Sequence, residues 1–291
     1  MQTLPITILF HEGPIARAYL SSLYHSGYKA DEIISLIYTK QPSTKKKIGW
    51  WLPKPIRIAY LKKVQELSFN YWPKQIKKEQ PIVFKAIIDN LKQVYPMAEA
   101  IIGQIIDPKP IKIFSNNVKY VLADNINDRN VERSLEAARN DLILFTGGGI
   151  LKKNILGIRN KRYLHVHPGY LPDIKGADGL LWSTLIRKKP GASAFFMAEK
   201  IDTGNIIDRQ EFKSPNFKIP KGSRPNNKTL YRAIFSYYDP LIRAELLLGL
   251  IKKFKLDDLP EMKQPSNKGD NYSFMDEPTL ERAFELLFPN C

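Results

Sequence analysis

The sequence contains a single cysteine, Cys291, which is its last residue. One thiol excludes intrachain disulfides and is typical of proteins in a reducing compartment. No run of about 18 apolar residues is present, so no transmembrane helix is expected. The first residues, Met1-Gln2-Thr3-Leu4-Pro5, carry no basic stretch ahead of an apolar run, and we predict no signal peptide. Together these absences predict a cytoplasmic protein.

Acidic residues are scarce relative to basic ones. The 291 residues include 45 Lys and Arg but 29 Asp and Glu, for a formal net charge of +16. Such a charge attracts phosphate-bearing ligands, nucleic acids and anionic lipid headgroups, and it does not distinguish among them. A basic surface that is simply solvated fits the same count. The charge therefore points to anionic partners without naming one, and the oligomeric state stays open.

The Gly-x-Gly-x-x-Gly fingerprint of dinucleotide-binding proteins is missing after the first predicted strand, where Gly13 stands alone. We therefore exclude a nicotinamide or flavin enzyme. The order of elements still predicts an α/β fold with a mostly parallel, Rossmann-like sheet, because a strand at 5–10, a helix at 15–26 and a strand at 32–38 form a βαβ unit. Further strands are predicted at 111–114, 118–122, 141–145, 163–167, 192–198 and 206–212, and helices at 81–106, 128–139, 180–188, 230–253 and 279–287.

Residues 41–80 interrupt this alternation. They hold ten Lys and Arg against two Glu, and three of the four tryptophans, Trp50, Trp51 and Trp72. Prolines at 42, 53, 55 and 73 are expected to divide the segment into short pieces. Aromatic side chains among cations suit nucleic acid, an anionic membrane surface or a bulky phosphorylated acceptor. The alternative is an ordinary insertion whose tryptophans fill a satellite core, and the sequence leaves these interpretations open.

Two of the four histidines fall in one short stretch, His165-Val166-His167-Pro168-Gly169-Tyr170-Leu171-Pro172. Residues 165 and 167 of a strand lie on the same face, so both imidazoles are expected to point toward one site. A histidine beside a Pro/Gly turn at the end of a strand is suited to acid–base chemistry. Asp202, at the start of Asp202-Thr203-Gly204, can orient such a histidine or accept its proton. No Cys/His cluster with metal-ligand spacing is present, and no metal is predicted.

These residues resemble the formyltransferases that use N10-formyltetrahydrofolate. The family pattern is Asn-x-His-Pro-(Ser/Gly)-x-Leu-Pro, then a basic residue and Gly, then a Trp, and later (Ile/Val)-Asp-(Thr/Ala)-Gly-x-Ile. The chain matches this pattern with residues 165–172, Lys175-Gly176, Trp182 and residues 201–206, and its 147–151 loop is similar to the family's folate-side loop. The similarity covers residues 120–212 well. The departure is His165, which stands where the family has asparagine.

The resemblance implies a role for each matching residue. In the family the asparagine amide hydrogen-bonds the formyl oxygen as the tetrahedral centre forms, and His165 would take over that role through an imidazole N–H. His167 would position and polarise the reacting centre, while Asp202 would hold His167 and shuttle the proton of the attacking amine. The pterin of N10-formyltetrahydrofolate would be held by the glycine loop and the segment before Asp202, namely by Gly147, Gly148, Gly149, Ile150, Leu151, Glu199 and Ile201.

The resemblance also implies a reaction, the transfer of a formyl group to a small-molecule primary amine that carries phosphate. An amino sugar or sugar nucleotide is the acceptor we expect. Three alternatives stay open: a formyltetrahydrofolate hydrolase, a non-catalytic folate- or nucleotide-binding relative in which His165 replaces the catalytic asparagine, and a methionyl-tRNA or other nucleic-acid-associated formyltransferase.

The domain organisation follows from the same resemblance. Residues 1–212 are expected to form the formyltransferase-like α/β catalytic domain, with an insertion at 41–110, and residues 213–291 a helical C-terminal extension. Residues 213–225 indicate a linker or lid. The extension does not predict the β-barrel that methionyl-tRNA formyltransferases use for tRNA, which disfavours tRNA as the acceptor.

Overall fold

The computed structural model describes residues 1–41, 44–265 and 268–289, so Pro42 and Cys291 lie outside the described residues. Its centre is a seven-stranded sheet with the order β3-β2-β1-β4-β5-β7-β8. The first five of these strands run parallel to one another. β7 runs antiparallel to β5, and β8 runs antiparallel to β7. The predicted mostly parallel α/β sheet is therefore confirmed. The strands are β1 (Gln2–Phe10), β2 (Tyr28–Tyr38), β3 (Val118–Ala123), β4 (Leu142–Phe145), β5 (Arg162–His167), β7 (Gly191–Phe196) and β8 (Ile206–Glu211).

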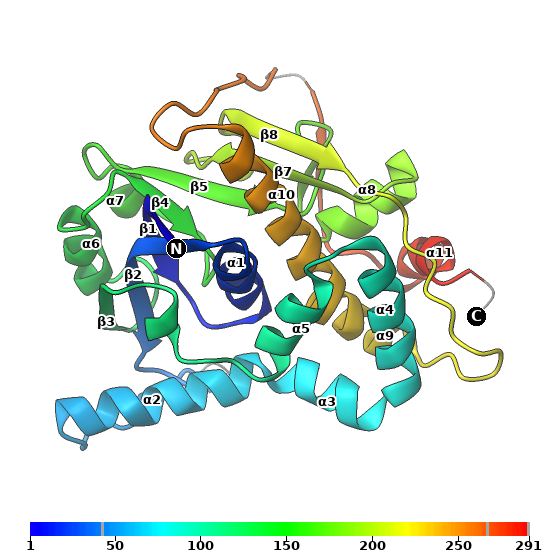
Figure 1. The fold of residues 1–291 in the computed structure, drawn as a ribbon, viewed down its shortest axis with the longest axis horizontal. Helices are drawn as coiled ribbons and strands as arrows, with labels where there is room; N and C mark the ends of the chain where they lie inside the picture. The colour runs from blue at the N-terminus through cyan, green and yellow to red at the C-terminus, as the bar shows by residue number, and fades with distance from the viewer. Residues whose placement is uncertain (42–43, 266–267, 290–291) are drawn as a thin grey trace.

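Helices cover both faces of the sheet (Figure 1). One face packs against α1 (Pro14–His25), α5 (Ala98–Ile106) and α10 (Asp239–Lys253), and the other against α6 (Arg129–Glu136) and α7 (Lys153–Leu156). Side chains of a strand alternate between faces, so β1 sends Ile6 and Ile8 into one core and Leu9 into the other. Because both faces are covered, the strands read as nearly continuous apolar runs.

The remaining elements lie around this layered body. α10 packs against α1, and β9 pairs with β6 beside the strand that carries the histidines. The boundary proposed at residue 212 stays a prediction. These elements are α2 (Lys54–Phe69), α3 (Tyr71–Glu79), α4 (Pro81–Val94), the 3-10 turn η1 (Ile111–Ile113), β6 (Ile174–Gly176), α8 (Gly179–Arg187), α9 (Asn227–Ala233), the π-helical turn η2 (Ile234–Tyr238), β9 (Asp270–Tyr272) and α11 (Glu277–Leu287).

Among the described residues we find no helix with the length and apolar character needed to cross a membrane.

Two expectations were wrong in this part of the molecule. Residues 111–114 form a 3-10 turn instead of a strand, because Pro110 starts the turn and the buried Ile111 and Phe114, three residues apart, face the same core. The tryptophans of the 41–80 segment fill no satellite core, since the exposed fractions of Trp50, Trp51 and Trp72 are 68%, 62% and 36%.

The 213–225 segment has no helix or strand, as expected of a linker or lid. Two of its side chains, Phe217 and Ile219, are nevertheless buried in the larger core. Those contacts hold the segment against the body of the protein in this structure.

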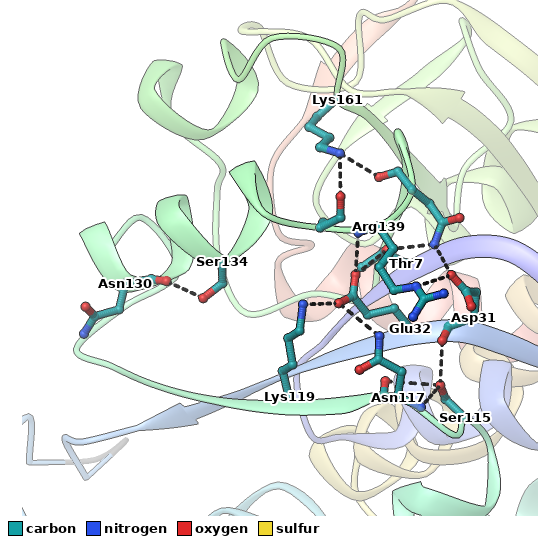
Figure 2. A network of polar contacts seen from close by, with 12 residues as sticks. Thr7, Asp31, Glu32, Ser115, Asn117, Lys119, Asn130, Ser134, Arg139 and Lys161 are labelled. Atoms are coloured by element: carbon teal, nitrogen blue, oxygen red, sulfur yellow. Dashed lines mark hydrogen bonds and ion pairs between the residues drawn. The ribbon is translucent and has the colours of Figure 1, made fainter.

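A buried carboxylate connects the three neighbouring strands β1, β2 and β3 (Figure 2). Glu32, on β2, accepts hydrogen bonds from Thr7 of β1 at 2.9 Å and from the backbone N–H of Arg139 at 2.9 Å. Lys119 of β3 forms an ion pair with it at 2.6 Å. Burial alone would raise the pKa of Glu32, but these donors outweigh burial and the pKa is lowered.

Candidate active site

Strand β5 presents both histidines of the motif. The alternation of its side chains places His165 and His167 on one face, as predicted. The His165 ring lies between two aromatic rings, with centroid distances of 5.2 Å to Phe145 and 5.7 Å to Phe195. These neighbours come from β4 and β7, the strands on either side of β5. His165 is therefore held by the sheet itself and not by a loop.

His165 is a neutral imidazole at physiological pH. Burial, with the charge of Arg243 adding to it, lowers the pKa of His165 from 6.5 to about 3. The residue is half-buried, but its Nδ1 atom is fully covered and has no hydrogen-bond partner among the described residues. A neutral imidazole carries one N–H group, which can donate one hydrogen bond to an oxyanion.

His167 is deeply buried and paired with Asp202. Its Nε2 lies 3.1 Å from the carbonyl oxygen of Ile174, and its Nδ1 lies 3.4 Å from Oδ2 of Asp202. A carbonyl oxygen only accepts, so we assign the ring proton to Nε2. Burial lowers the pKa of His167 despite the opposing effect of Asp202. Nδ1 is then unprotonated and faces the Asp202 carboxylate. A proton taken up at this pair would be shared by Nδ1 of His167 and Oδ2 of Asp202.

Asp202 sits in a turn whose backbone is unusual for a residue with a side chain. Its φ angle is 55°, in the left-handed region, which aspartate tolerates better than most residues. The turn aims the carboxylate inward, where Oδ2 accepts a hydrogen bond of 2.8 Å from the N–H of Gly176. Left-handed residues of this kind often cluster at functional sites.

The glycine loop that follows β4 lies next to the histidines. Gly147, Gly148 and Gly149 all have positive φ angles, of 123°, 105° and 134°. At Gly148 a Cβ atom would stand 2.8 Å from the Tyr38 hydroxyl and 3.0 Å from the His11 ring, so a side chain has no room there. The Tyr38 hydroxyl also donates a hydrogen bond of 2.9 Å to the Gly148 carbonyl. The bare backbone of this loop separates two cavities.

The first of these, which we call the histidine cavity, has a volume of about 160 Å³. Seven of the ten predicted site residues line it. His167 lies behind Asp202, outside the lining, and so does Gly147, while Gly148 lines the neighbouring cavity instead. The seven are Gly149, Ile150, Leu151, His165, Glu199, Ile201 and Asp202.

The second, which we call the tyrosine cavity, has a volume of about 400 Å³. Aromatic rings of His11, Tyr38 and Phe69 line it together with Lys40 and Lys45. The Nε2 atom of His11 is buried and has no hydrogen-bond partner among the described residues, and burial lowers the pKa of His11 to about 4. Sequence analysis did not predict this cavity, because its lining comes from segments more than 100 residues apart.

Arg243 is a second feature that sequence analysis missed. This buried side chain of α10 forms an ion pair with Asp239 at 3.0 Å and donates a hydrogen bond of 3.1 Å to the carbonyl of Val166, the residue between the two histidines. Its positive charge contributes to the lowered pKa of both imidazoles. An arginine in a long apolar helix, 77 positions after Val166, gives no sequence signal that it lies beneath β5.

No group of three or more His, Cys, Asp or Glu side chains suited to a metal ion occurs in the described ranges.

Comparison with known proteins finds a family model and relatives that are similar to the part of the chain that carries this site. The formyl transferase family model matches residues 76–213. The chain is 30% identical over 166 residues to a methionyl-tRNA formyltransferase of Buchnera aphidicola subsp. Acyrthosiphon pisum, which is 56% of this chain and 49% of that protein. The chain thus spans about half the length of the curated relatives it matches first.

Solved formyltransferase structures are also similar to this one. A sugar N-formyltransferase from a Shewanella species has a TM-score of 0.47 and 11% identity, over 98% of this chain and 87% of that one. The formyltransferase PseJ of Anoxybacillus kamchatkensis, solved with a UDP-linked formamido sugar and tetrahydrofolate, has a TM-score of 0.39 and 19% identity, over 60% of this chain and 88% of that one. The formyl transferase family model thus matches the part of the chain that carries the histidine motif and Asp202.

Proposed function

We propose that the protein transfers the formyl group of N10-formyltetrahydrofolate to a primary amine. The observation that carries this proposal is the histidine cavity, where a neutral imidazole, a carboxylate and the bare backbone of the glycine loop meet. The exposed side chains of Ile150 and Ile201, at 64% and 51%, offer apolar surface at the mouth of the cavity for the flat pterin. Glu199 lies at the same mouth and offers an acceptor for its amino group.

The proposed reaction is an acyl transfer. The amine nitrogen attacks the formyl carbon, and the carbonyl oxygen becomes an oxyanion that accepts a hydrogen bond from neutral His165. The amine proton passes to Asp202, which lines the cavity, and is shared with Nδ1 of His167 at 3.4 Å. The bond between the formyl carbon and N10 then breaks, N10 takes up a proton, and tetrahydrofolate and the formamide leave.

The acceptor would enter from the tyrosine cavity, on the other side of the glycine loop. Its aromatic rings suit a flat ring, and Lys40 and Lys45 suit phosphate. A phosphate-bearing amine, such as an amino sugar on a nucleotide, combines both features. The similarity to a methionyl-tRNA formyltransferase makes aminoacyl-tRNA the second acceptor to test.

The test is tetrahydrofolate release from N10-formyltetrahydrofolate, measured with no amine, with nucleotide-linked amino sugars and with methionyl-tRNA. We expect release only when an amino sugar nucleotide is present. Release without any amine would identify a hydrolase, release with methionyl-tRNA alone would name the other acceptor, and no release with tight folate binding would indicate a non-catalytic relative.

A variant of Lys45 tests whether the tyrosine cavity binds the acceptor. Lys45→Ala should raise the KM for the phosphate-bearing acceptor several-fold and leave the dissociation constant of the folate unchanged. Lys221→Ala, which changes an exposed lysine outside both cavities, should alter neither. An unchanged acceptor KM in the Lys45 variant would contradict the placement of the acceptor.

A further inference from the structure

Exposed apolar side chains are concentrated on one small part of the surface. Of the sixteen large apolar side chains that are exposed among the described residues, seven lie between positions 50 and 72. Five of the seven, with Lys63, form the surface that we call the α2 face. Its members are Trp50, Trp51, Ile56, Tyr60, Lys63 and Leu67, with exposed fractions of 44% to 68% for the five apolar ones.

Helical geometry places four members of the α2 face along one line. Positions 56, 60, 63 and 67 follow the spacing i, i+4, i+7, i+11, which keeps them on one side of α2. Trp50 and Trp51 lie just before the helix, next to each other, with a ring centroid distance of 6.0 Å. Figure 1 shows α2 along the lower edge of the molecule, as an outermost element.

The opposite side of α2 already anchors the helix. Leu61 is fully buried, and the Gln65 side chain bonds the backbone of β2 twice, accepting from the N–H of Tyr38 at 2.8 Å and donating to the carbonyl of Leu36 at 3.2 Å. The α2 face therefore contributes nothing to holding the helix on the sheet. Apolar side chains exposed in this number normally mark a surface that binds something.

The charge around the α2 face is strongly positive. Residues 41–80 contain ten Lys and Arg and two Glu, and one of the two, Glu66, is paired with Lys63 at 3.0 Å. Lys54 is exposed beside the two tryptophans. The partner that covers this surface must therefore be anionic where it meets the lysines and apolar where it meets Ile56 and Leu67.

We propose that the α2 face docks on an anionic lipid bilayer, with α2 lying in the plane of the interface. Trp and Tyr prefer the headgroup level, aliphatic side chains enter the acyl boundary, and lysines reach the anionic headgroups. A second copy of the chain would bring an identical excess of eight positive charges to the same contact, which is repulsive. Single-stranded nucleic acid satisfies cations and aromatic rings, but leaves Ile56 and Leu67 without an apolar partner.

This proposal is independent of the proposed reaction, and its test uses the full chain. Co-sedimentation with vesicles of phosphatidylcholine alone, and of phosphatidylcholine with 30% phosphatidylglycerol, measures partitioning at about 0.15 M salt. We expect at least tenfold stronger partitioning to the anionic vesicles, with a blue shift of tryptophan fluorescence. The triple variant W50S/W51S/L67S should lose at least tenfold in partitioning, while its circular dichroism stays that of the wild type.

The matched control is I186S/M262S, which removes two apolar side chains of similar exposure, 47% and 49%, from other parts of the surface, and it should bind as the wild type does. If the triple variant and the wild type bind anionic vesicles equally, the proposal is overturned, because charge attraction alone then explains the binding. The proposal would also be overturned if the wild type binds no vesicles but binds single-stranded RNA or self-associates, and the W50S/W51S/L67S substitutions abolish that binding or self-association.

Discussion

At the residue scale, His165 is the position where the chain departs from the family pattern that it resembles, and we expect it to govern the proposed reaction. In the family this position carries an amide, which donates a hydrogen bond at any pH. Here the rings of Phe145 and Phe195 and the buried Arg243 keep the pKa of His165 near 3. The imidazole therefore stays neutral and matches the asparagine in charge, although the two side chains differ in length and shape.

The first prediction concerns this substitution. His165→Asn should keep kcat within about tenfold of the wild type or raise it, because the amide also donates one hydrogen bond to the oxyanion. His165→Ala should lower kcat by about 100-fold or more, the usual effect of removing one oxyanion donor. Steady-state kinetics check both, with folate binding measured by calorimetry as the control. An asparagine variant as inactive as the alanine variant would show that the ring itself is needed.

Much of the site was predictable at this scale, because strand alternation alone put the two histidines on one face. That Asp202 can orient a histidine was inferred from the residues, and its assignment to His167 came from the family resemblance. The roles of these residues stay predictions. Arg243 and the tyrosine cavity were beyond prediction, since long-range packing and not a local pattern brings their residues to the site.

At the element scale, α2 shows how the same residue can stop or start a helix. Prolines at 53 and 55 were expected to divide the 41–80 segment, yet they lie at the beginning of a 16-residue helix. A proline in the first turn lacks only an N–H that would have had no partner there, and its φ angle suits the helix. Pro81 and Pro240 begin α4 and α10 in the same way.

Another element-scale prediction concerns β2 and its buried carboxylate. Glu32→Gln should lower the free energy of unfolding by about 2–4 kcal/mol, because it removes the negative charge that Lys119 and the buried donors meet. The pKa of Glu32 is lower in the folded protein than its ordinary 4.5, so its stabilising effect is present above pH 4.5 and is lost as the pH falls through the folded pKa.

Urea denaturation at pH 7 and at pH 3.5 measures this effect. The gap between wild type and variant should be smaller at the lower pH. Glu99→Gln is the control, since Glu99 also pairs with a lysine, at 2.9 Å, but its side chain is 79% exposed, and little change is expected. Equal losses in the two variants would mean that burial of Glu32 does not matter.

At the scale of the whole molecule, residues from the far end of the chain complete the site. β9 pairs with β6, the strand whose Gly176 N–H holds Asp202. Trp182 of α8 stacks on Tyr272 with a centroid distance of 4.5 Å and donates a hydrogen bond to the carbonyl of Ser273 at 2.9 Å. The sequence predicted a helical extension with a helix at 279–287, but not that the residues before this helix would lie against the family motif.

Two glycines provide a test of that contact. Gly269 and Gly222 have similar φ angles, 82° and 80°, but a Cβ atom on Gly269 would stand 1.6 Å from the carbonyl oxygen of Pro172, whereas one on Gly222 meets nothing within 4 Å. Gly222→Ala should cost about 1 kcal/mol of stability through backbone strain alone. Gly269→Ala should cost more and also lower kcat, because Pro172 belongs to the histidine motif. Thermal denaturation and kinetics compare the two, and identical effects would refute a coupling between tail and site.

The pairing of β6 with β9 also has a consequence for synthesis of the protein. Gly176 and Tyr272, which pair at the end of these strands, are 96 residues apart. At the usual rates of translation, roughly 5 to 20 s pass between their appearance on the ribosome. Once Asp202 has also been made, and until β9 follows, the nascent chain contains the histidines and Asp202 without the strand that supports their surroundings. We therefore expect truncated products that end before β9 to lack the β6–β9 pairing that supports the surroundings of Asp202.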